Sequence, residues 1–135
     1  MGKLVTVITR SDLVDFYLAN MTDTDVIIMV SYSGETTNLT RFTKSIHAQK
    51  IPLIVLTSYG TNTLSEQADV VLTISTHEKL IENYGNFSTN LSISYLFDCL
   101  YAGYFSKVYE TNYQQKIQLE KQYQQFRFSD NPLIE

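Results

Sequence analysis

The stretch Asp25-Val-Ile-Ile-Met-Val-Ser-Tyr-Ser-Gly-Glu-Thr-Thr37 decides the fold of this chain. Its first part, Val26–Val30, is an uninterrupted apolar run that is too short for a helix, and such a run is typical of a strand buried on both faces of a parallel sheet. Beyond the stretch, Leu39, Phe42 and Ile46 recur with a period near 3.6, which indicates a helix. The residues between the two patterns therefore form a strand-to-helix turn.

Four hydroxyl groups gather in this turn, on Ser31, Ser33, Thr36 and Thr37, with Gly34 among them. The start of a helix has unpaired N–H groups and partial positive charge, which together suit an anion. A glycine there lets a ligand oxygen approach the backbone. The alternative is that Ser33 is simply the helix cap, but a cap accounts for only one hydroxyl. We therefore favour a site for a phosphate-type anion.

These residues also carry a family resemblance. The sequence Ser31-Tyr-Ser-Gly-Glu-Thr36 after an apolar strand resembles the phosphosugar-binding loop of the SIS (sugar isomerase) domain. Pro52–Thr57 and Asn62–Leu72 resemble the family's next two strands with their intervening turn, and the resemblance runs from about Lys3 to Asp98. It implies that two serines, a threonine and nearby backbone N–H groups hold a sugar phosphate. The implied phosphate-binding residues are Ser31, Tyr32, Ser33, Gly34 and Thr36.

Strand and helix patterns alternate along the first half of the chain. We expect strands at Lys3–Thr9, Val26–Val30, Leu53–Thr57 and Val70–Ile74, helices at Ser11–Asn20, Thr37–Gln49 and Thr63–Ala68, and a helix cap at Asn62. This order predicts an α/β fold with an open parallel sheet of the SIS/flavodoxin-like type and helices on both faces. Ligands of such sheets bind beyond the carboxyl ends of the strands, where Ser31, Ser58 and Thr76 should lie.

The second half of the chain reads as a long C-terminal helical segment. Helical periodicity begins near Ser88 and continues to Phe126, with Gly103 as a possible kink. Tyrosines recur between Tyr109 and Tyr123 at helical spacing, a pattern more typical of half-buried packing, on the sheet or on a second subunit, than of a cofactor site. Residues 129–135 read as a frayed tail, so we expect a single domain over residues 1–128.

Composition limits the possible functions. The chain has 135 residues, a net charge of −4 and no basic cluster, which argues against nucleic-acid binding by the chain itself. No apolar run approaches the ~20 residues of a membrane span. The single cysteine, Cys99, falls in a helical pattern, where we expect a buried thiol, and fits a cytoplasmic protein without disulfides. No residues have the spacing of a metal site, and we expect no cofactor.

The resemblance also has a gap. Complete SIS domains begin with a further strand, a glycine-rich turn and a helix before the strand that Leu4–Ile8 resembles, and this chain shows no counterpart to them. We favour an N-terminally truncated domain from a longer gene product over a sheet that is closed differently. The tyrosine of the loop and the C-terminal tail most resemble the effector domain of RpiR-type transcription regulators. DNA binding would then belong to a missing N-terminal helix-turn-helix module.

Three functional hypotheses follow. The leading one is a sensor domain that binds a sugar phosphate, and the alternative is an aldose–ketose phosphosugar isomerase. Isomerisation needs an acid–base group, for which the candidates are His77, Glu78, Lys79 and Glu82, but such a loop is more typical of a solvated surface. We therefore predict no catalytic residues. A third hypothesis is an incomplete fold that binds nothing. Exposed strand edges and the tyrosines also predict a homo-oligomer, and the family resemblance implies a dimer.

Overall fold

The computed structural model describes residues 3–75 and 87–124. Two compact units make up this part of the chain. The described residues of 6–97 form the first unit, and residues 3–5 together with 98–124 form the second. The first contains the sheet, and the second consists mainly of helix.

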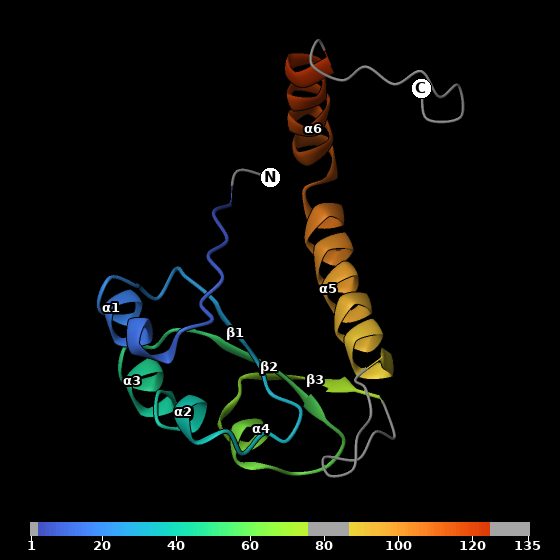
Figure 1. The fold of residues 1–135 in the computed structure, drawn as a ribbon. Helices are drawn as coiled ribbons and strands as arrows, with labels where there is room; N and C mark the ends of the chain where they lie inside the picture. The colour runs from blue at the N-terminus through green and yellow to red at the C-terminus, as the bar shows by residue number, and fades with distance from the viewer. Residues whose placement is uncertain (1–2, 76–86, 125–135) are drawn as a thin grey trace. The chain divides into compact units, whose positions relative to one another are not determined.

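The sheet has three parallel strands in the order β1-β2-β3 (Figure 1). They are β1 (Ile27–Val30), β2 (Leu53–Ser58) and β3 (Val70–Ile74). Each is an aliphatic, largely β-branched run of the kind that favours a sheet. Ile27 is aligned with Leu53 in the first pair of strands, and Ile54 with Val70 in the second. All three strands agree with the sequence prediction to within one residue at either end.

Short helices precede β1 and connect the three strands. They are η1 (Ser11–Leu13), α1 (Val14–Ala19), α2 (Thr37–Thr40), α3 (Thr43–Ala48) and α4 (Thr63–Gln67). The predicted α/β class with an open parallel sheet is confirmed. The single helix predicted for Thr37–Gln49 is wrong, because it is divided between α2 and α3. At the division the Thr43 hydroxyl donates to the carbonyl of Thr40 at 2.7 Å, and such a bond competes with the regular helical pattern.

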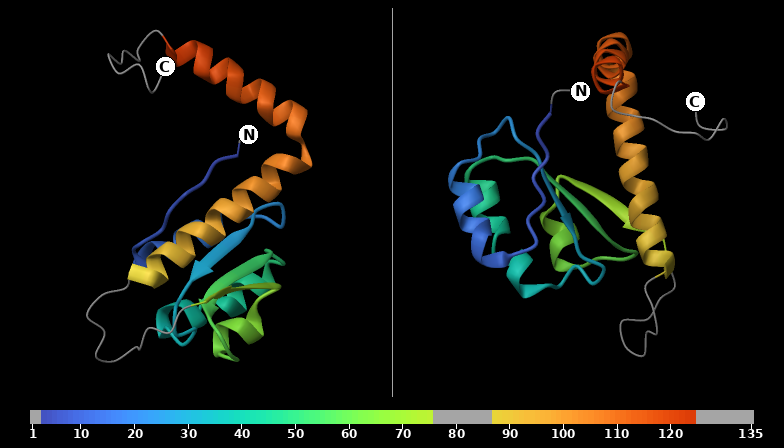
Figure 2. Two further views of the ribbon diagram at one scale, coloured as in Figure 1. Left: turned by 90° about the vertical axis from the view of Figure 1, so that its right-hand side faces the viewer. Right: turned by 45° about the horizontal axis from the view of Figure 1, so that its top comes forward.

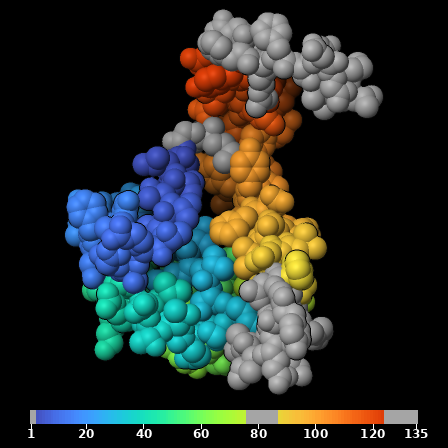
Figure 3. All heavy atoms as spheres, in the orientation of Figure 1, coloured from blue at the N-terminus to red at the C-terminus, as the bar shows by residue number. Residues whose placement is uncertain are grey.

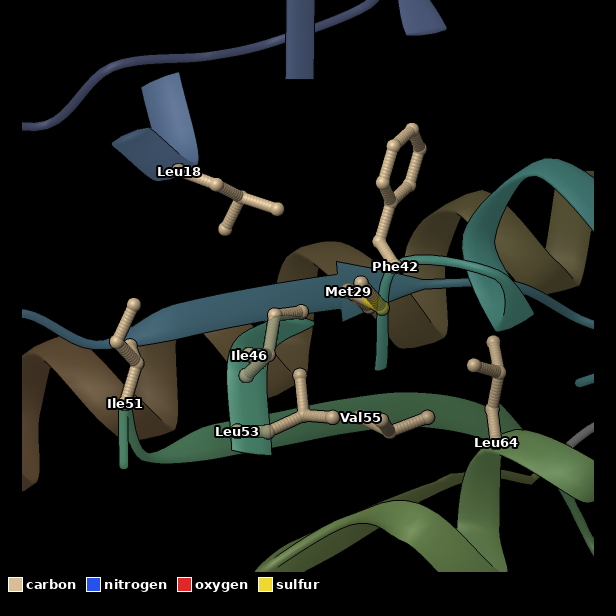
Figure 4. Close-up of a cluster of buried hydrophobic side chains, with 8 residues drawn as sticks. All are labelled: Leu18, Met29, Phe42, Ile46, Ile51, Leu53, Val55 and Leu64. Carbon is tan, nitrogen blue, oxygen red and sulfur yellow. The ribbon is translucent and has the colours of Figure 1, made fainter. Parts of the chain in front are cut away.

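One face of the sheet carries the hydrophobic core. Met29, Leu53 and Val55 point into it from β1 and β2, and the last two are fully buried. Leu18 of α1, Ile46 of α3 and Leu64 of α4 pack against them, as Figure 4 shows. Phe42 and Ile51 complete this cluster. The core therefore fixes three of the helices on the same side of the sheet.

The first predicted strand, Lys3–Thr9, is absent. These residues form no strand, and Leu4 and Val7 are 93% and 82% exposed. Figure 3 shows this N-terminal segment in dark blue at the surface. A strand needs a hydrogen-bonded neighbour, but β1, at one edge of the sheet, pairs only with β2 among the described residues. The apolar, β-branched pattern of Lys3–Thr9 predicted a strand, but these residues pair with no strand of the described part of the chain.

The long C-terminal helical segment is confirmed as α5 (Phe87–Lys107) and α6 (Tyr109–Gln124) (Figure 2). The predicted kink at Gly103 is wrong, because α5 continues through that residue and ends at Lys107. Beyond the break between α5 and α6, the Asn112 side chain donates to the carbonyl of Phe105 at 3.1 Å. This bond gives a hydrogen-bond partner to a carbonyl in the last turn of α5. Cys99 is exposed, so the prediction of a buried thiol is also wrong.

An aromatic ladder runs along one side of these two helices. It consists of Tyr101, Phe105, Tyr109 and Tyr113, whose successive ring centroids lie 5.9, 5.6 and 5.6 Å apart. The spacing of four residues places successive rings on the same helical face. Tyr101, Tyr109 and Tyr113 remain 42–55% exposed, so the ladder is an apolar surface rather than part of a core.

Candidate functional site

The turn singled out by the sequence is the loop Ser31–Thr36, between β1 and α2 (Figure 1). It lies at the carboxyl edge of the sheet, beside the end of β2. The carbonyl of Tyr32 accepts hydrogen bonds from the Ser58 N–H at 3.0 Å and the Thr57 hydroxyl at 3.3 Å. Ser31 and Ser58 thus lie at the same edge, as predicted, whereas Thr76 lies outside the described residues.

Ser31 and Thr36 form a pair of hydroxyl groups at the centre of the loop. Their oxygens lie 2.8 Å apart, and the Ser31 oxygen also accepts the Gly34 N–H at 3.2 Å. Ser31 is buried, while Thr36 is exposed. One of the two hydroxyl protons occupies the bond between the two oxygens. The other proton can therefore be donated to an incoming acceptor such as a phosphate oxygen.

Ser33 does not cap the following helix. Its oxygen accepts the Glu35 N–H at 3.2 Å within the loop. The N-cap of α2 is Thr36, whose side chain makes no capping hydrogen bond. The capping interpretation of Ser33 is therefore wrong. α2 has only four residues, so its dipole is small, and the argument for an anion rests on the hydroxyls.

Gly34 has a structural role that the sequence did not indicate. Its φ of +67° is in the left-handed region, and a Cβ there would overlap the side-chain amide of Asn62. The glycine is therefore needed for contact with the next loop, in addition to any approach of a ligand. Asn62 caps α4 as predicted, because its side chain accepts the Ser65 N–H at 2.9 Å, and its amide donates to the Thr57 hydroxyl at 3.0 Å.

Glu35 points away from the hydroxyl pair and binds the start of α4. Its two carboxylate oxygens accept the Thr63 N–H at 2.7 Å and the Thr63 hydroxyl at 2.6 Å. These two bonds from Thr63, the hydroxyl first, lower the pKa of the Glu35 carboxyl. The sequence gave no partner for Glu35, because the pair spans 28 residues. The helix cap predicted at Asn62 was the only local signal nearby.

The candidate acid–base residues of the isomerase hypothesis, His77, Glu78, Lys79 and Glu82, lie outside the described residues. Within residues 3–75 and 87–124, no group of three or more His, Cys, Asp or Glu side chains could hold a metal ion. No helix in these same ranges is long and apolar enough to span a membrane. The loop Ser31–Thr36 is therefore the candidate site that the described residues support.

Comparison with known proteins identifies the family. The SIS domain model matches residues 1–102 of the chain. The chain belongs to the SIS domain family. The sequence resemblance that began with the Ser31–Thr36 loop is thereby confirmed at the level of the family, and the match extends through most of α5.

Two curated relatives carry descriptions of regulators. This chain is 31% identical over 110 residues to the uncharacterized HTH-type transcriptional regulator YbbH of Bacillus subtilis, covering 81% of this chain and 38% of that protein. It is 33% identical over 64 residues to an uncharacterized HTH-type transcriptional regulator of Thermotoga maritima, covering 47% of this chain and 23% of that protein. The chain thus spans well under half the length of either relative. The descriptions of both relatives as transcriptional regulators give no support to the isomerase alternative.

A solved structure shares the fold. The Vibrio vulnificus NanR protein complexed with ManNAc-6P matches with a TM-score of 0.74 and 20% identity, covering 88% of this chain and 46% of that chain. At this identity the likeness concerns the fold, which is the SIS fold expected from the sequence. The complex shows that NanR, a protein with this fold, binds a sugar phosphate.

Proposed function

We propose that this SIS domain is the phosphosugar-binding sensor, or effector, domain of a transcription regulator of the RpiR type. The descriptions of the two curated relatives as HTH-type transcriptional regulators support the regulatory part. The fold shared with NanR, which was solved with a sugar phosphate, supports the class of ligand. The observation that carries the proposal is the Ser31–Thr36 hydroxyl pair at the carboxyl edge of β1, where neither side chain is used to cap a helix.

In this proposal the phosphate is held by neutral donors. The spare proton of the Ser31–Thr36 pair and the Ser33 hydroxyl donate to phosphate oxygens, together with backbone N–H groups near Tyr32. The Gly34 N–H already donates to Ser31, so Gly34 holds the serine in place and lets the loop turn. Each hydrogen bond to a charged group contributes about 1.5–3 kcal/mol, and several of them together are needed to retain a phosphate against water.

The test is calorimetric titration of the protein with sugar phosphates, starting with N-acetylmannosamine 6-phosphate and fructose 6-phosphate. Ser31→Ala should weaken binding roughly ten- to a hundredfold, because it removes one bond to a charged group. Ser45→Ala is the matched control, since Ser45 is an exposed serine on α3. Equal binding by wild type and Ser31→Ala would exclude the loop as the phosphate site, provided that circular dichroism shows the same fold.

A sensor should bind its ligand without converting it. We expect no exchange of the C2 proton of a bound sugar phosphate with solvent, whereas an isomerase must move that proton. Solvent deuterium at C2, detected by NMR after incubation with the protein, would contradict the sensor proposal. DNA contacts would come from a helix-turn-helix module elsewhere in a longer protein, and residues 1–128 would act as one cytoplasmic domain.

We also propose that the domain forms a homodimer. The aromatic ladder is an exposed apolar surface on α5 and α6, and burial of such surface favours association. β1 adds an edge that no strand of the described residues covers on its outer side. Sedimentation at tens of micromolar, a range suited to weak dimers, should show dimers. Tyr109→Ser combined with Tyr113→Ser should shift the equilibrium to monomer, and a wild type that sediments only as monomer would refute the proposal.

A further inference from the structure

The loop that carries the hydroxyl pair is joined to the start of α4 by three hydrogen bonds. The Leu64 N–H donates to the carbonyl of Gly34 at 3.0 Å. The Thr63 N–H and hydroxyl donate to the two carboxylate oxygens of Glu35 at 2.7 and 2.6 Å. Thus Gly34 and Glu35, in the middle of the loop, are bound to a helix that follows a different strand.

The hydrogen bonds from Thr63 constrain the geometry of the Glu35 side chain. Two donors of one residue approach two oxygens of one carboxylate, which defines the orientation of Glu35 as well as its distance. The Thr63 N–H belongs to the first turn of α4, where backbone donors have no partner within the helix. Glu35 provides that partner across the gap between the two loops. We call the two hydrogen bonds from Thr63 to the Glu35 carboxylate the Glu35–Thr63 latch.

The latch acts next to the atoms of the proposed site. Glu35 lies between Gly34, whose N–H donates to Ser31, and Thr36, whose hydroxyl is bonded to Ser31. The Glu35 N–H itself donates to the Ser33 oxygen. Any movement of the Glu35 backbone would therefore displace hydrogen-bond partners of Ser31 and Ser33. The Glu35 carboxylate is turned to Thr63, so it can control the loop without bringing a like charge against a phosphate.

We propose that Glu35 is a positioning residue for the phosphate site: through the latch to Thr63 it holds the loop Ser31–Thr36 in the conformation that binds the ligand. This inference rests on the function proposed above and adds a residue that does not touch the ligand. The phosphate is bound by the hydroxyls, and the latch determines what fraction of the molecules presents them correctly. An apparent Kd rises as that fraction falls.

The first experiment compares two substitutions with the same change of charge. Glu35→Gln retains one oxygen acceptor but loses the second, so the latch cannot form both bonds. If the competent fraction falls to about a tenth, the Kd for N-acetylmannosamine 6-phosphate rises about tenfold. Glu66→Gln is the matched control, because Glu66 is an exposed glutamate on α4 itself, and its Kd should stay within about twofold of wild type. An equal loss in both variants would indicate a general charge effect and overturn the proposal.

The second experiment approaches the latch from the other partner. Thr63→Ala removes the hydroxyl donor but retains the N–H, whereas Thr63→Ser retains both, so serine should restore most of the affinity that alanine loses. In Glu35→Gln combined with Thr63→Ala, the losses should not add, because both changes break the same contact. Additive losses would show that Glu35 and Thr63 act independently and would refute the latch. These threonine variants also carry the test if Glu35→Gln fails to fold.

A third measurement separates positioning from simple stabilisation. If the latched loop binds the ligand more tightly, the ligand must in turn favour the latched loop. Amide hydrogen exchange at Thr63 should therefore slow when N-acetylmannosamine 6-phosphate is added, relative to exchange at Glu66 in the same helix. The slowing should disappear in Glu35→Gln. No ligand effect on Thr63 would show that the latch only stabilises α4.

Binding by the Ser31 and Glu35 variants distinguishes a failure of the proposed phosphate site from a failure of the positioning role. Loss of binding in Ser31→Ala with wild-type affinity in Glu35→Gln would retain the phosphate site and overturn the positioning role. Wild-type affinity in both variants would overturn the proposed site and the positioning role together. If neither N-acetylmannosamine 6-phosphate nor fructose 6-phosphate binds the wild-type protein, both proposals fail, since Glu35 would then position nothing.

Discussion

The sheet region and the C-terminal helices are stabilised in different ways. All buried apolar side chains of the described residues lie between Leu18 and Ile74, around the sheet. Across residues 98–124 no apolar side chain is buried, although α5 and α6 are the two longest helices of the described residues. Long helices gain most of their stability from packing of an apolar face. The comparison indicates that the sheet region has its own core, whereas residues 98–124 of the helices bury no apolar face of their own.

The largest difference in stability is expected when a leucine of the core and a leucine of the helices are each replaced by alanine. Leu53 is fully buried in β2, whereas Leu119 in α6 is 51% exposed. Leu53→Ala should reduce the free energy of unfolding by about 2–5 kcal/mol, through lost burial and the cavity left behind. Leu119→Ala should change it by less than about 0.5 kcal/mol. Urea denaturation of dilute protein measures both, and similar losses would contradict the contrast between the regions.

Replacing a glycine by alanine should change the stability in opposite directions in the two regions. Gly34→Ala should destabilise the protein by more than about 1 kcal/mol, because its φ is positive and the added Cβ meets Asn62. A Cβ at Gly103, inside α5, would meet nothing within 4 Å. Gly103→Ala should therefore stabilise the helix by about 0.5–1 kcal/mol. Thermal unfolding followed by circular dichroism gives the sign of each change, and a stabilising Gly34→Ala would contradict the described contact.

The smallest difference is expected between two asparagines. Asn62→Ala removes the cap of α4 and the bond to Thr57, which should cost about 0.5–2 kcal/mol. Asn112→Ala removes one bond to Phe105 but puts a better helix former into α6, and these contributions of about 1 and 0.6 kcal/mol nearly cancel. Denaturant midpoints of the two variants measure the difference. A larger loss for Asn112→Ala would show that the break between α5 and α6 is a principal support of the helices.

How far the sequence predicted the structure depended on whether local pattern and pairing agreed. The strands at Leu53–Thr57 and Val70–Ile74 were predicted closely, because both are short aliphatic runs and each has a neighbouring strand in the sheet. Lys3–Thr9 has a similar local pattern, but a strand also requires a neighbour, which no local pattern reveals. The division near Phe42 was missed because Leu39, Phe42 and Ile46 keep a helical period across it, and this apolar pattern gives no sign of the bond from the Thr43 hydroxyl to the Thr40 carbonyl.

The same distinction applies to the candidate site. The hydroxyl cluster at Ser31–Thr36 could be recognised because its members are neighbours in the sequence. The contacts of Gly34 with Asn62 and of Glu35 with Thr63 could not, since each joins two separate loops. The sequence therefore indicated which groups could meet a ligand. The structure was needed to see what holds those groups in place.

The aromatic ladder has a consequence for how this protein can be observed. The chain contains ten tyrosines and no tryptophan, so its near-ultraviolet spectrum comes largely from tyrosine. The rings of Tyr109 and Tyr113 are stacked at 5.6 Å with an angle of 12° between their planes, and Phe105 connects them with Tyr101 across the break between α5 and α6. Transitions of rings this close are coupled. The near-ultraviolet circular dichroism of the unlabelled chain therefore contains a contribution from these coupled rings at the junction between the two helices.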